Sequence, residues 1–354
     1  MPGNGNLTAA KKAKNDEFYT QWLDVEREMD AYLLHDPDVF RGKVVLLPCD
    51  DPDWSQFTKF FVERFAQLGL SKLISTCYAE GAHGKWYTLT SEGEAAGLLE
   101  GDGDFRSAEV AAFRDEADIV ITNPPFSMFR DFMAWLVEGD VRFAVIGNLN
   151  AITYKEVFPL IKSNRVWLGN NYAVNGGAMF YEIPESIANL DQVREIREND
   201  NGTKTYITRV QGVRWFTNIE HGRRHDPLVL MTEADNVKFG PKGIKGVGYL
   251  RYDNYDALEV PKVIAIPADY DGVVGVPISF LDKYCPEQFE ILGNGQTMAD
   301  ELGIRPVGQK FVDDYYAQGN KGQINAKWNN LVYRIGTQTV VPYQRILIRR
   351  KDDQ

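Results

Sequence analysis

The tetrapeptide Asn123-Pro124-Pro125-Phe126 interrupts the apolar stretch ADIVITNPPFSMFRDF. An amino group on a nucleobase becomes more nucleophilic when two acceptors hold its protons, because its lone pair is then drawn out of the ring. The Asn123 side-chain carbonyl and the Pro124 main-chain carbonyl can be those acceptors. Two consecutive prolines fix φ and have no amide hydrogens, so the turn offers carbonyls without competing donors. Phe126 offers a face on which an extruded base can stack.

An Asn-Pro-Pro turn is also a common entry into a helix, with proline at the first helical position. Here the turn follows the β-branched run of residues 117–123 and precedes a helical pattern that contains Phe129, Phe132 and Leu136. A polar turn between a buried strand and an amphipathic helix is where α/β proteins position ligands. This context favours the catalytic interpretation.

An acidic turn follows the first extended run, KVVLLPCD, where Asp50 is succeeded by Asp51 and Pro52. No G-x-G-x-x-G follows this run, and the chain contains no G-x-x-x-x-G-K-[ST] loop. Carboxylates repel phosphate but accept hydrogen bonds from hydroxyl and ammonium groups. The turn therefore suits a cofactor with a ribose and a cationic amino-acid end but no phosphate. The alternative is that Asp53 or Ser55 simply caps the next helix.

Two further segments are expected at the same edge of the sheet. Cys77 and Tyr78 end the second extended run, and Asp104 and Phe105 belong to the stretch GDGDF before the third helix. Ligands of open α/β sheets lie outside the carboxyl ends of the strands, so these residues should line one crevice. Asp104 is a candidate acceptor for an adenine amine of the cofactor, although GDGDF is equally consistent with a plain glycine-rich turn.

The elements around these turns alternate between strands and helices. We expect helices over 17–34, 55–69, 107–116 and near 154–163, another that contains Phe129, Phe132, Met133 and Leu136, and strands over 43–50, 72–78, 117–123 and 142–148. This alternation specifies βαβ units and a mostly parallel sheet, which places the chain in the α/β class. RVWLGN and GAMFYEIP are separated by only seven residues, so we expect a hairpin that adds one antiparallel strand. Beyond about residue 220 the pattern becomes irregular.

Length and charge suggest two functional parts. The chain has 354 residues, which exceeds the usual size of a single core. Residues 1–160 contain 15 Lys/Arg and 26 Asp/Glu, whereas the remainder contains 24 of each, so the net charge of -11 lies in the first part. Any phosphate-facing surface should therefore lie mainly in the second part, where EHGRRHD, KFGPKGIKG and RILIRRK gather positive charge. Each stretch alone is more often a solvated surface than a DNA contact.

Cysteine, histidine and hydropathy patterns exclude several classes of site. Cys49, Cys77 and Cys285 are widely spaced and odd in number, so we expect reduced thiols. His221 and His225 share a polar loop, and we expect no metal site. No uncharged apolar run approaches 18 residues, and no signal peptide precedes the first helix, so we expect a cytoplasmic protein without a membrane segment.

The stretches LPCDDPDWSQFTKFF, KLISTCY, EADIVITNPPFSMFRDF, GNLNAITYKEVFP and GVRWFTNIEH together resemble the EcoRI-type adenine-specific DNA methyltransferases. The resemblance runs from about Asn15 to residue 220 and more loosely beyond. It implies a Rossmann-like methyltransferase sheet with an irregular C-terminal target-recognition region. It also implies S-adenosylmethionine as methyl donor, no metal, and methylation of the N6 amine of a flipped-out adenine in double-stranded DNA.

The same resemblance nominates residues before the first helix. The stretch NDEFYTQ is similar to the aromatic-threonine segment that approaches the methionine end of the cofactor, which implicates Phe18, Tyr19 and Thr20. An acidic ribose ligand is usual at the end of the second strand. This chain has Thr-Cys-Tyr there, and Glu80 is the nearest candidate.

The resemblance also implies an order of domains. We expect residues 1–35 to form an arm and helix that contribute to the cofactor site, 36–220 to form the catalytic domain, and 221–354 to recognise the DNA target. We expect a monomer, associated with the nucleoid of a bacterial or phage-infected cell, with any cognate restriction endonuclease acting separately. Two alternatives stay open: the same chemistry on RNA or on a protein amide, and a DNA-binding relative that has lost catalysis.

Overall fold

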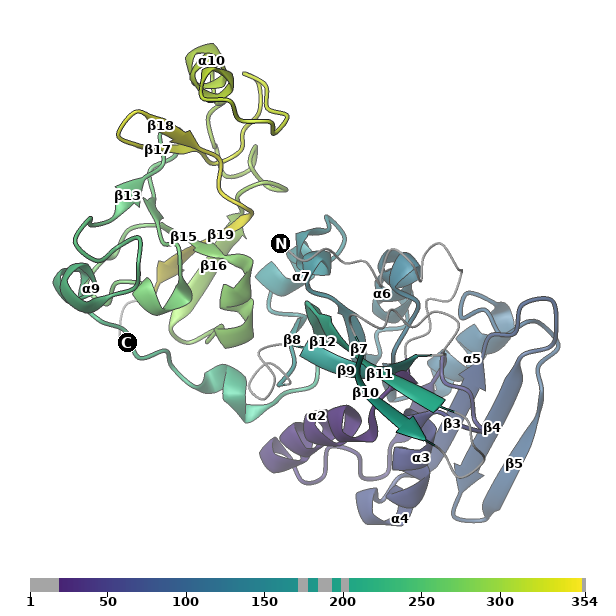
Figure 1. The fold of residues 1–354 in the computed structure, drawn as a ribbon. Helices are drawn as coiled ribbons and strands as arrows, with labels where there is room; N and C mark the ends of the chain where they lie inside the picture. Colours follow the sequence, from purple (N-terminus) through teal and green to yellow (C-terminus); the bar gives the residue numbers. More distant parts are fainter. Residues whose placement is uncertain (1–18, 171–177, 184–192, 199–203, 352–354) are drawn as a thin grey trace. The chain divides into compact units, whose positions relative to one another are not determined.

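The computed structural model describes residues 19–170, 178–183, 193–198 and 204–351 (Figure 1). The chain divides into two compact units. One contains the residues up to 151 together with 165–222, and the other contains 152–164 together with the residues from 223 onward. The short helix α7 (Phe158–Lys162) packs against β16 (Phe289–Asn294) of the second unit, which explains why 152–164 belongs there.

An eight-stranded sheet is the centre of the first unit. Its strands, in spatial order, are β5 (Gly93–Leu98), β4 (Lys85–Thr90), β3 (Lys72–Cys77), β2 (Val44–Leu47), β6 (Ile119–Thr122), β7 (Arg142–Asn148), β12 (Val213–Thr217) and β8 (Trp167–Leu168). The four middle strands, β3, β2, β6 and β7, run parallel. They are almost wholly buried, as expected for parallel strands covered on both faces. The α/β class predicted from the sequence is confirmed.

Both edges of this sheet are antiparallel. Strands β4 and β5 form a hairpin that pairs with β3. The sequence indicated only a polar excursion in that stretch, because the strand residues are half-exposed or exposed and lack a clear alternation.

The expected hairpin of RVWLGN and GAMFYEIP is not formed. RVWLGN supplies β8 of the central sheet, whereas GAMFYEIP supplies β9 (Ala178–Ile183) of another sheet. The strand beside β7 is instead β12, which pairs with both β7 and β8. All five residues of β12 are buried, so this strand suits the interior position.

A second, four-stranded sheet of the first unit is entirely antiparallel. Its order is β1 (Tyr19–Thr20), β9, β11 (Lys204–Gln211) and β10 (Val193–Glu198). Strand β1 also lies against helix α3 (Gln56–Glu63). The chain segment before the first helix is thereby fixed beside the helix that follows β2.

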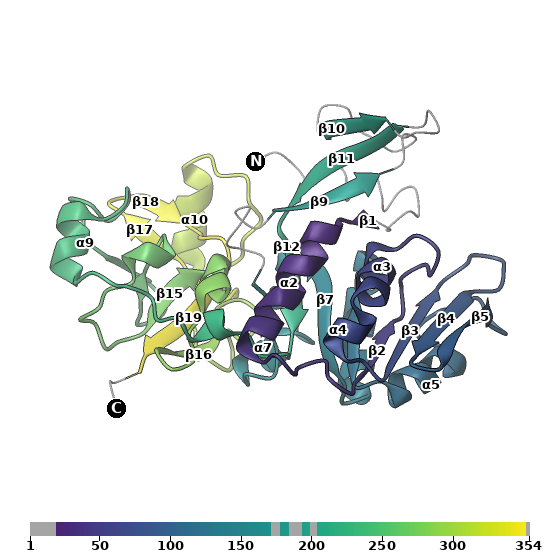
Figure 2. The ribbon, with the colours of Figure 1, turned by 90° about the horizontal axis from the view of Figure 1, so that it is seen from below.

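Helices cover both faces of the central sheet (Figures 1 and 2). On one face lie α2 (Trp22–His35), α3 and α4 (Phe65–Leu68), and on the other lie α5 (Ala108–Glu116) and α6 (Phe129–Glu138). Alternate residues of each strand face the two layers, so that Val45 and Leu47 pack with α2 and α3 in one core. Gly69 ends α4 in the left-handed conformation, with φ of 66°. A glycine stop was expected at this position.

The second unit consists of short elements. Its five-stranded sheet has the order β13 (Leu250–Arg251), β14 (Leu258–Glu259), β15 (Val274–Pro277), β19 (Arg345–Arg350) and β16. The unit also contains α7, a two-stranded ribbon of β17 (Tyr333–Ile335) and β18 (Gln338–Val340), and the helices α9 (Glu233–Phe239) and α10 (Gln309–Ala317). In the described part of the chain, no helix is long and apolar enough to cross a membrane.

Candidate active site

The order of the parallel strands creates a switch point between β2 and β6. The chain passes from β2 to β3 on one side, and then crosses to β6 on the other side of β2. The crevice outside the carboxyl ends at such a point is the usual ligand site of an open α/β sheet. Asp50 comes shortly after β2 and Asn123 directly after β6, so both predicted turns lie at this edge.

Asp50 connects the elements on both sides of the switch point. Its carboxylate accepts hydrogen bonds from Ser55 Oγ at 2.8 Å and from Thr122 Oγ1 at 2.6 Å. Its backbone N–H donates to the carbonyl of Thr76 at 2.9 Å. The residue is only 6% exposed. Asp50 therefore joins the acidic turn to α3, β3 and the strand that precedes Asn123.

Asp51 and Asp53 form an ion-pair cluster with Lys85 of strand β4. Lys85 Nζ lies 3.3 Å from Asp51 Oδ2 and also contacts the Asp53 carboxylate. The hydrogen bond to Asp53, which has the largest effect, and the contact with Asp51 raise the pKa of Lys85 to about 12. Lys85 was not predicted as a partner of this turn, because its approach depends on the β4–β5 hairpin, which was not predicted either. Pro52 is partly buried within the turn.

The helix-capping alternative for this turn is realised by Ser55. Ser55 Oγ accepts the Phe57 N–H at 3.1 Å and is the N-cap of α3. Asp53 does not cap the helix, since the described contacts of its carboxylate are with Lys85. Ser55 thus caps the helix, whereas Asp51 and Pro52 take no part in capping.

Cys77 and Tyr78 mark the end of β3. The Cys77 side chain is buried with Sγ 3.7 Å from Asp51 Oδ2, and burial raises the pKa of the thiol to about 11. The thiol therefore stays protonated at neutral pH. Tyr78 is 48% exposed, and Glu80 is exposed as well. At this strand end, the side chain of Tyr78 therefore offers a ligand more surface than the buried side chain of Cys77.

The GDGDF loop lies directly against the end of β3. The Ala79 N–H donates to the carbonyl of Asp102 at 2.8 Å. Gly103 has φ of 84°, and a Cβ on it would be 2.2 Å from the carbonyl oxygen of Cys77. Only glycine fits this approach. The two segments expected to line one crevice are therefore in contact.

Asp104 and Phe105 have partners of their own in this loop. The Asp104 carboxylate accepts hydrogen bonds from the N–H and Nε of Arg106, both at 2.9 Å, and these bonds lower its pKa. Phe105 is buried, with its ring 4.9 Å from that of Phe132 and 5.7 Å from that of Trp135 on α6. Phe105 thus anchors the loop to α6.

The Asn-Pro-Pro-Phe turn connects β6 to α6, and the contacts of its residues hold it in place. Asn123 Oδ1 and Pro124 are buried. The Pro125 carbonyl accepts the Met128 N–H at 3.0 Å, whereas no backbone amide of the described residues donates to the Pro124 carbonyl. Phe126 is half-buried and begins a short 3-10 helix.

Helix α6 is itself held close to the sheet. A Cβ on Gly147 of β7 would be 2.4 Å from Cε2 of Phe129, the first residue of α6. The glycine allows the Phe129 ring to pack directly on the strand. The Asn-Pro-Pro-Phe turn is therefore fixed by β6 before it and by this close helix packing after it.

The segment before the first helix contributes a buried hydroxyl. Phe18 lies outside the described residues, and Tyr19 and Thr20 pair with Glu182 and Tyr181 as strand β1. Thr20 is 4% exposed, and its Oγ1 has no hydrogen-bond partner among the residues that the structure describes. Such a group typically costs about 1–3 kcal/mol. A polar atom of a ligand would offset that cost.

The chemistry of these groups fits S-adenosylmethionine. The acidic turn, the exposed ring of Tyr78 and the buried Thr20 hydroxyl suit hydroxyl, amino and adenine groups. A glycine-rich phosphate loop is missing from the sequence, as a phosphate-free cofactor requires. Within the described ranges, no cluster of three or more His, Cys, Asp or Glu side chains is placed to hold a metal.

A parallel sheet with an acidic turn at its switch point and a rigid Asn-Pro-Pro-Phe turn after the neighbouring strand defines a Rossmann-like methyltransferase that acts on amino groups. Comparison with known proteins gives the family. The sequence profile described as "Adenine-specific methyltransferase EcoRI" matches residues 6–96 and 89–351. The chain belongs to this family, which implies S-adenosylmethionine as the methyl donor.

Relatives from three bacteria match most of the chain. The Type II methyltransferase M.EcoRI of Escherichia coli is 41% identical over 82% of this chain and 89% of its own length. M.MpnI of Mycoplasma pneumoniae is 36% identical over 80% and 83%, and M.MgeORF184P of Mycoplasma genitalium is 34% identical over 81% and 85%. No solved structure matches the chain significantly.

Proposed function

We propose that the protein transfers a methyl group from S-adenosylmethionine to the N6 amine of an adenine within a specific sequence of duplex DNA. The observation that carries this proposal is the rigid turn from Asn123 to Phe126, coupled through Thr122 to the acidic turn at Asp50. The relatives carry the name Type II methyltransferase, and the family is described as adenine-specific, which supports the choice of DNA and of adenine.

The chain's own groups would hold and activate the amine. Asn123 Oδ1 and the Pro124 carbonyl accept its two hydrogens, which keeps the nitrogen lone pair available for attack. Phe126 stacks on the base, which must leave the duplex because its amine is otherwise inaccessible. S-adenosylmethionine supplies an electrophilic methyl group when bound. The amine nitrogen would accept this methyl group as the donor's carbon–sulfur bond breaks, and the amine proton would pass to water.

The cofactor-binding residues divide into two groups. Tyr19, Thr20, Asp51 and Tyr78 are assigned direct contacts with S-adenosylmethionine, together with Phe18. The remaining residues support them: Asp50 and Pro52 shape the acidic turn, and Cys77, Asp104 and Phe105 hold the loop at the end of β3. Burial of Asp50, Cys77 and Phe105, and the Arg106 contact of Asp104, favour this supporting role.

Phosphate contacts are assigned to one of the three basic stretches. In EHGRRHD, Arg224 is buried and donates to Asn164. In RILIRRK, the Arg345 side chain is 11% exposed and donates to Glu259 at 2.6 Å, and Arg350 pairs with Asp271. The lysines of KFGPKGIKG, at 238, 242 and 245, are all exposed. These three lysines are the cations best suited to the DNA backbone.

The second unit is assigned the role of target recognition. The protein acts as a monomer on DNA in the bacterial nucleoid, and a restriction endonuclease, where the host carries one, acts as a separate protein. Size-exclusion chromatography with light scattering, with and without a duplex, measures the stoichiometry. The mass of a dimer, measured both with and without the duplex, would contradict the proposal that the protein acts as a monomer.

The substrate is tested by transfer of label. The full chain is incubated with S-adenosylmethionine labelled in its methyl group and with duplex DNA, RNA or a mixture of proteins. Label in the N6 position of adenine in DNA is expected. Label only in RNA or in protein would overturn the proposal in favour of another amino substrate, and no label in any would indicate a DNA-binding protein without catalysis.

The site is tested by a matched pair of variants. Asn123→Ala removes one acceptor and should lower kcat by about 100-fold or more, the usual effect of losing one preorganised polar contact in a transition state. Glu63→Ala changes an exposed residue of α3 and should leave kcat unchanged. Both should bind S-adenosylmethionine with the affinity of the wild type. Unchanged methylation by Asn123→Ala would show that the active site lies elsewhere.

A further inference from the structure

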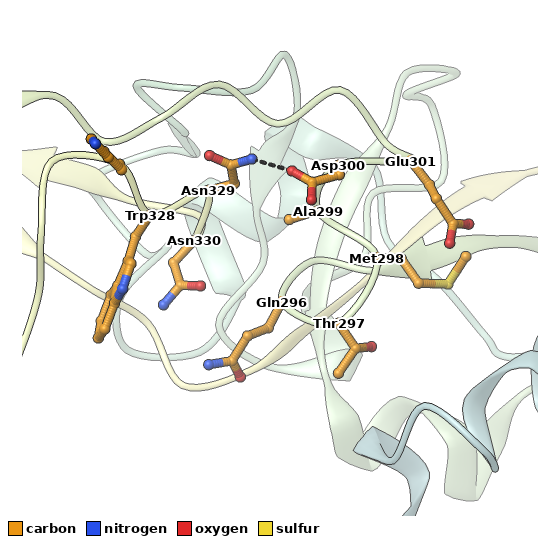
Figure 3. Close-up of a pocket in the computed structure, with 10 residues that line it drawn as sticks. Gln296, Thr297, Met298, Ala299, Asp300, Glu301, Trp328, Asn329 and Asn330 are labelled. Atoms are coloured by element: carbon orange, nitrogen blue, oxygen red, sulfur yellow. Dashed lines mark hydrogen bonds between the residues drawn. The ribbon is translucent and has the colours of Figure 1, made fainter.

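The second unit contains a hollow of about 520 Å³ that the methyl-transfer chemistry does not use. Two stretches line it, residues 296–301 after strand β16 and residues 327–330 before strand β17 (Figure 3). Both are loop segments, yet each is held by a buried asparagine.

The first wall is fixed by Asn294, which is completely buried at the end of β16. Its Oδ1 accepts the N–H groups of Gln296 at 2.9 Å and of Thr297 at 3.1 Å. The Gln296 backbone is therefore tied to the sheet. A side chain that leaves from such a backbone is preorganised for contact with a ligand.

The second wall is fixed by Asn254, which is 5% exposed. Its Nδ2 donates to the carbonyl of Asn330 at 2.8 Å, and its Oδ1 accepts the Val332 N–H at 3.1 Å. The Val307 N–H donates to the carbonyl of Trp328 at 2.7 Å. The backbones of both walls are thus held in place by hydrogen bonds to buried asparagine side chains.

The lining combines an indole ring with carboxamides. Figure 3 shows the Trp328 ring, the Asn330 amide and the Gln296 amide on the same side of the hollow, whereas the Asn329 amide is turned to Asp300, to which it donates a hydrogen bond. Trp328 is 37% exposed, so its ring is accessible. Gln296 and Asn330 are the two amides available to a ligand here.

A smaller hollow of about 260 Å³ adjoins the first. Gln296 and Asn330 line both, and Tyr343 lines the smaller one with a 58% exposed side chain. The two amides therefore belong to a continuous depression that has an exposed aromatic residue in each of its parts.

The charges of the lining argue against a phosphate ligand. Lys327 is opposed by Asp300 and Glu301, so the larger hollow has no excess of positive charge. A carboxamide presents one donor and one acceptor side by side, which matches the hydrogen-bonding edge of a nucleobase. An exposed indole stacks on bases of any kind. The fitting ligand is a planar, uncharged heterocycle with its own donors and acceptors.

We propose that this depression binds a base of the DNA recognition sequence other than the methylated adenine, and that Gln296, Asn330 and Trp328 help to set the sequence specificity. The inference rests on the proposed function, because DNA is then the substrate that supplies bases to the second unit. The base is either read at its edge within the duplex or taken out of the stack onto Trp328.

The test compares variants of the full chain on a pool of duplexes with randomised bases around the adenine. Gln296→Ala, Asn330→Ala and Trp328→Ala are examined with Gln323→Ala, a matched control at an exposed position outside both hollows. Sequencing of methylated adenines should give one site for the wild type and the control. In the three variants, discrimination at one position should fall by about tenfold, as expected when one base contact is lost.

A second measurement distinguishes the two ways of recognising the base, either at its edge within the duplex or outside the stack on Trp328. 2-Aminopurine is placed in turn at each non-target position of the duplex. A fluorescence change at one position with the wild type, which differs in Trp328→Ala but is kept in Trp328→Phe, supports a base stacked on Trp328 outside the duplex, because stacking on an aromatic ring alters the emission of 2-aminopurine. Relaxed specificity without any fluorescence change supports reading of a paired base edge.

The failure of this inference is separable from that of the proposed function. A wild type that methylates no DNA contradicts the function itself. A wild type that methylates one sequence, together with Gln296→Ala and Asn330→Ala variants that select the same sequence with unchanged KM for DNA, overturns only the base-binding role. Thermal unfolding of each variant confirms that the chain is folded, and the two amide variants decide the matter if Trp328→Ala does not fold.

Discussion

The Thr122 hydroxyl donates a hydrogen bond to Asp50 Oδ2 across 2.6 Å, and both side chains are buried. This contact joins the strands on the two sides of the switch point. Because Asp50 also accepts a hydrogen bond from Ser55 at 2.8 Å, one carboxylate fixes the acidic turn, the start of α3 and the strand that carries Asn123. The geometry of the Asn-Pro-Pro-Phe turn therefore depends on the acidic turn at Asp50.

Replacing Thr122 with valine tests this coupling. Thr122→Val keeps the shape of the side chain but leaves the buried Asp50 acceptor with one hydrogen-bond partner fewer. We expect the free energy of unfolding to fall by about 1–3 kcal/mol, measured by urea denaturation. Thr122→Ser keeps the hydroxyl and should recover most of that loss. Equal stability of the valine variant and the wild type would show that the bond contributes nothing.

The close approach of Gly103 to Cys77 leads to a second prediction, which concerns the affinity for S-adenosylmethionine. Gly103→Ala would put a Cβ 2.2 Å from the Cys77 carbonyl oxygen, so the GDGDF loop must move. We expect affinity for S-adenosylmethionine, measured by calorimetry, to fall at least tenfold. Gly81→Ala is the matched control, since Gly81 has a similar φ of 71° but open space around it. That change should cost only about 1 kcal/mol of backbone strain and leave the affinity unchanged.

The buried thiol of Cys77 predicts a pH dependence. Its pKa is raised from 9.0 to about 11, first by burial, so the folded state binds its proton more tightly than the unfolded state. The resulting stabilisation is fully present below pH 9 and is lost as the pH rises through about 11. Because only the thiolate is alkylated, the rate of Cys77 labelling should rise about tenfold per pH unit from 8 to 10. Mass spectrometry of peptides measures this rate, and a plateau near pH 9 would contradict the raised pKa.

The sequence predicted the elements whose signals are local. The spacing of Phe57, Phe60 and Phe61 predicted a helix that ends at Gly69, and the structure divides this stretch at Arg64 into α3 and α4. The apolar runs predicted the parallel strands because strands buried on both faces need apolar residues at every position. The Asn-Pro-Pro-Phe turn was located for the same reason, since a strong strand and a strong helix flank it.

The features that could not be predicted depend on contacts between residues that are far apart in the sequence. Lys85 joins Asp51 only because β4 and β5 fold back on β3, and the half-exposed residues of that hairpin carry a weak pattern. The choice of β12 over β9 as the neighbour of β7 is a tertiary choice between two strand-forming stretches. The partners of Asp50, up to 72 residues away, likewise had no local signal.

The exposed lysines of KFGPKGIKG make the last prediction. Lys238, Lys242 and Lys245 are exposed, and the Lys238 Nζ lies 4.8 Å from the ring of Phe239. If they contact phosphates, each lost contact lowers the slope of log affinity against log salt by about 1, and affinity falls equally for specific and non-specific duplexes. The triple alanine variant should therefore reduce the slope by up to about 3. Lys59→Ala, at an exposed position of α3, is the control and should leave the slope unchanged. An unchanged slope in the triple variant would assign the phosphate contacts to other cations.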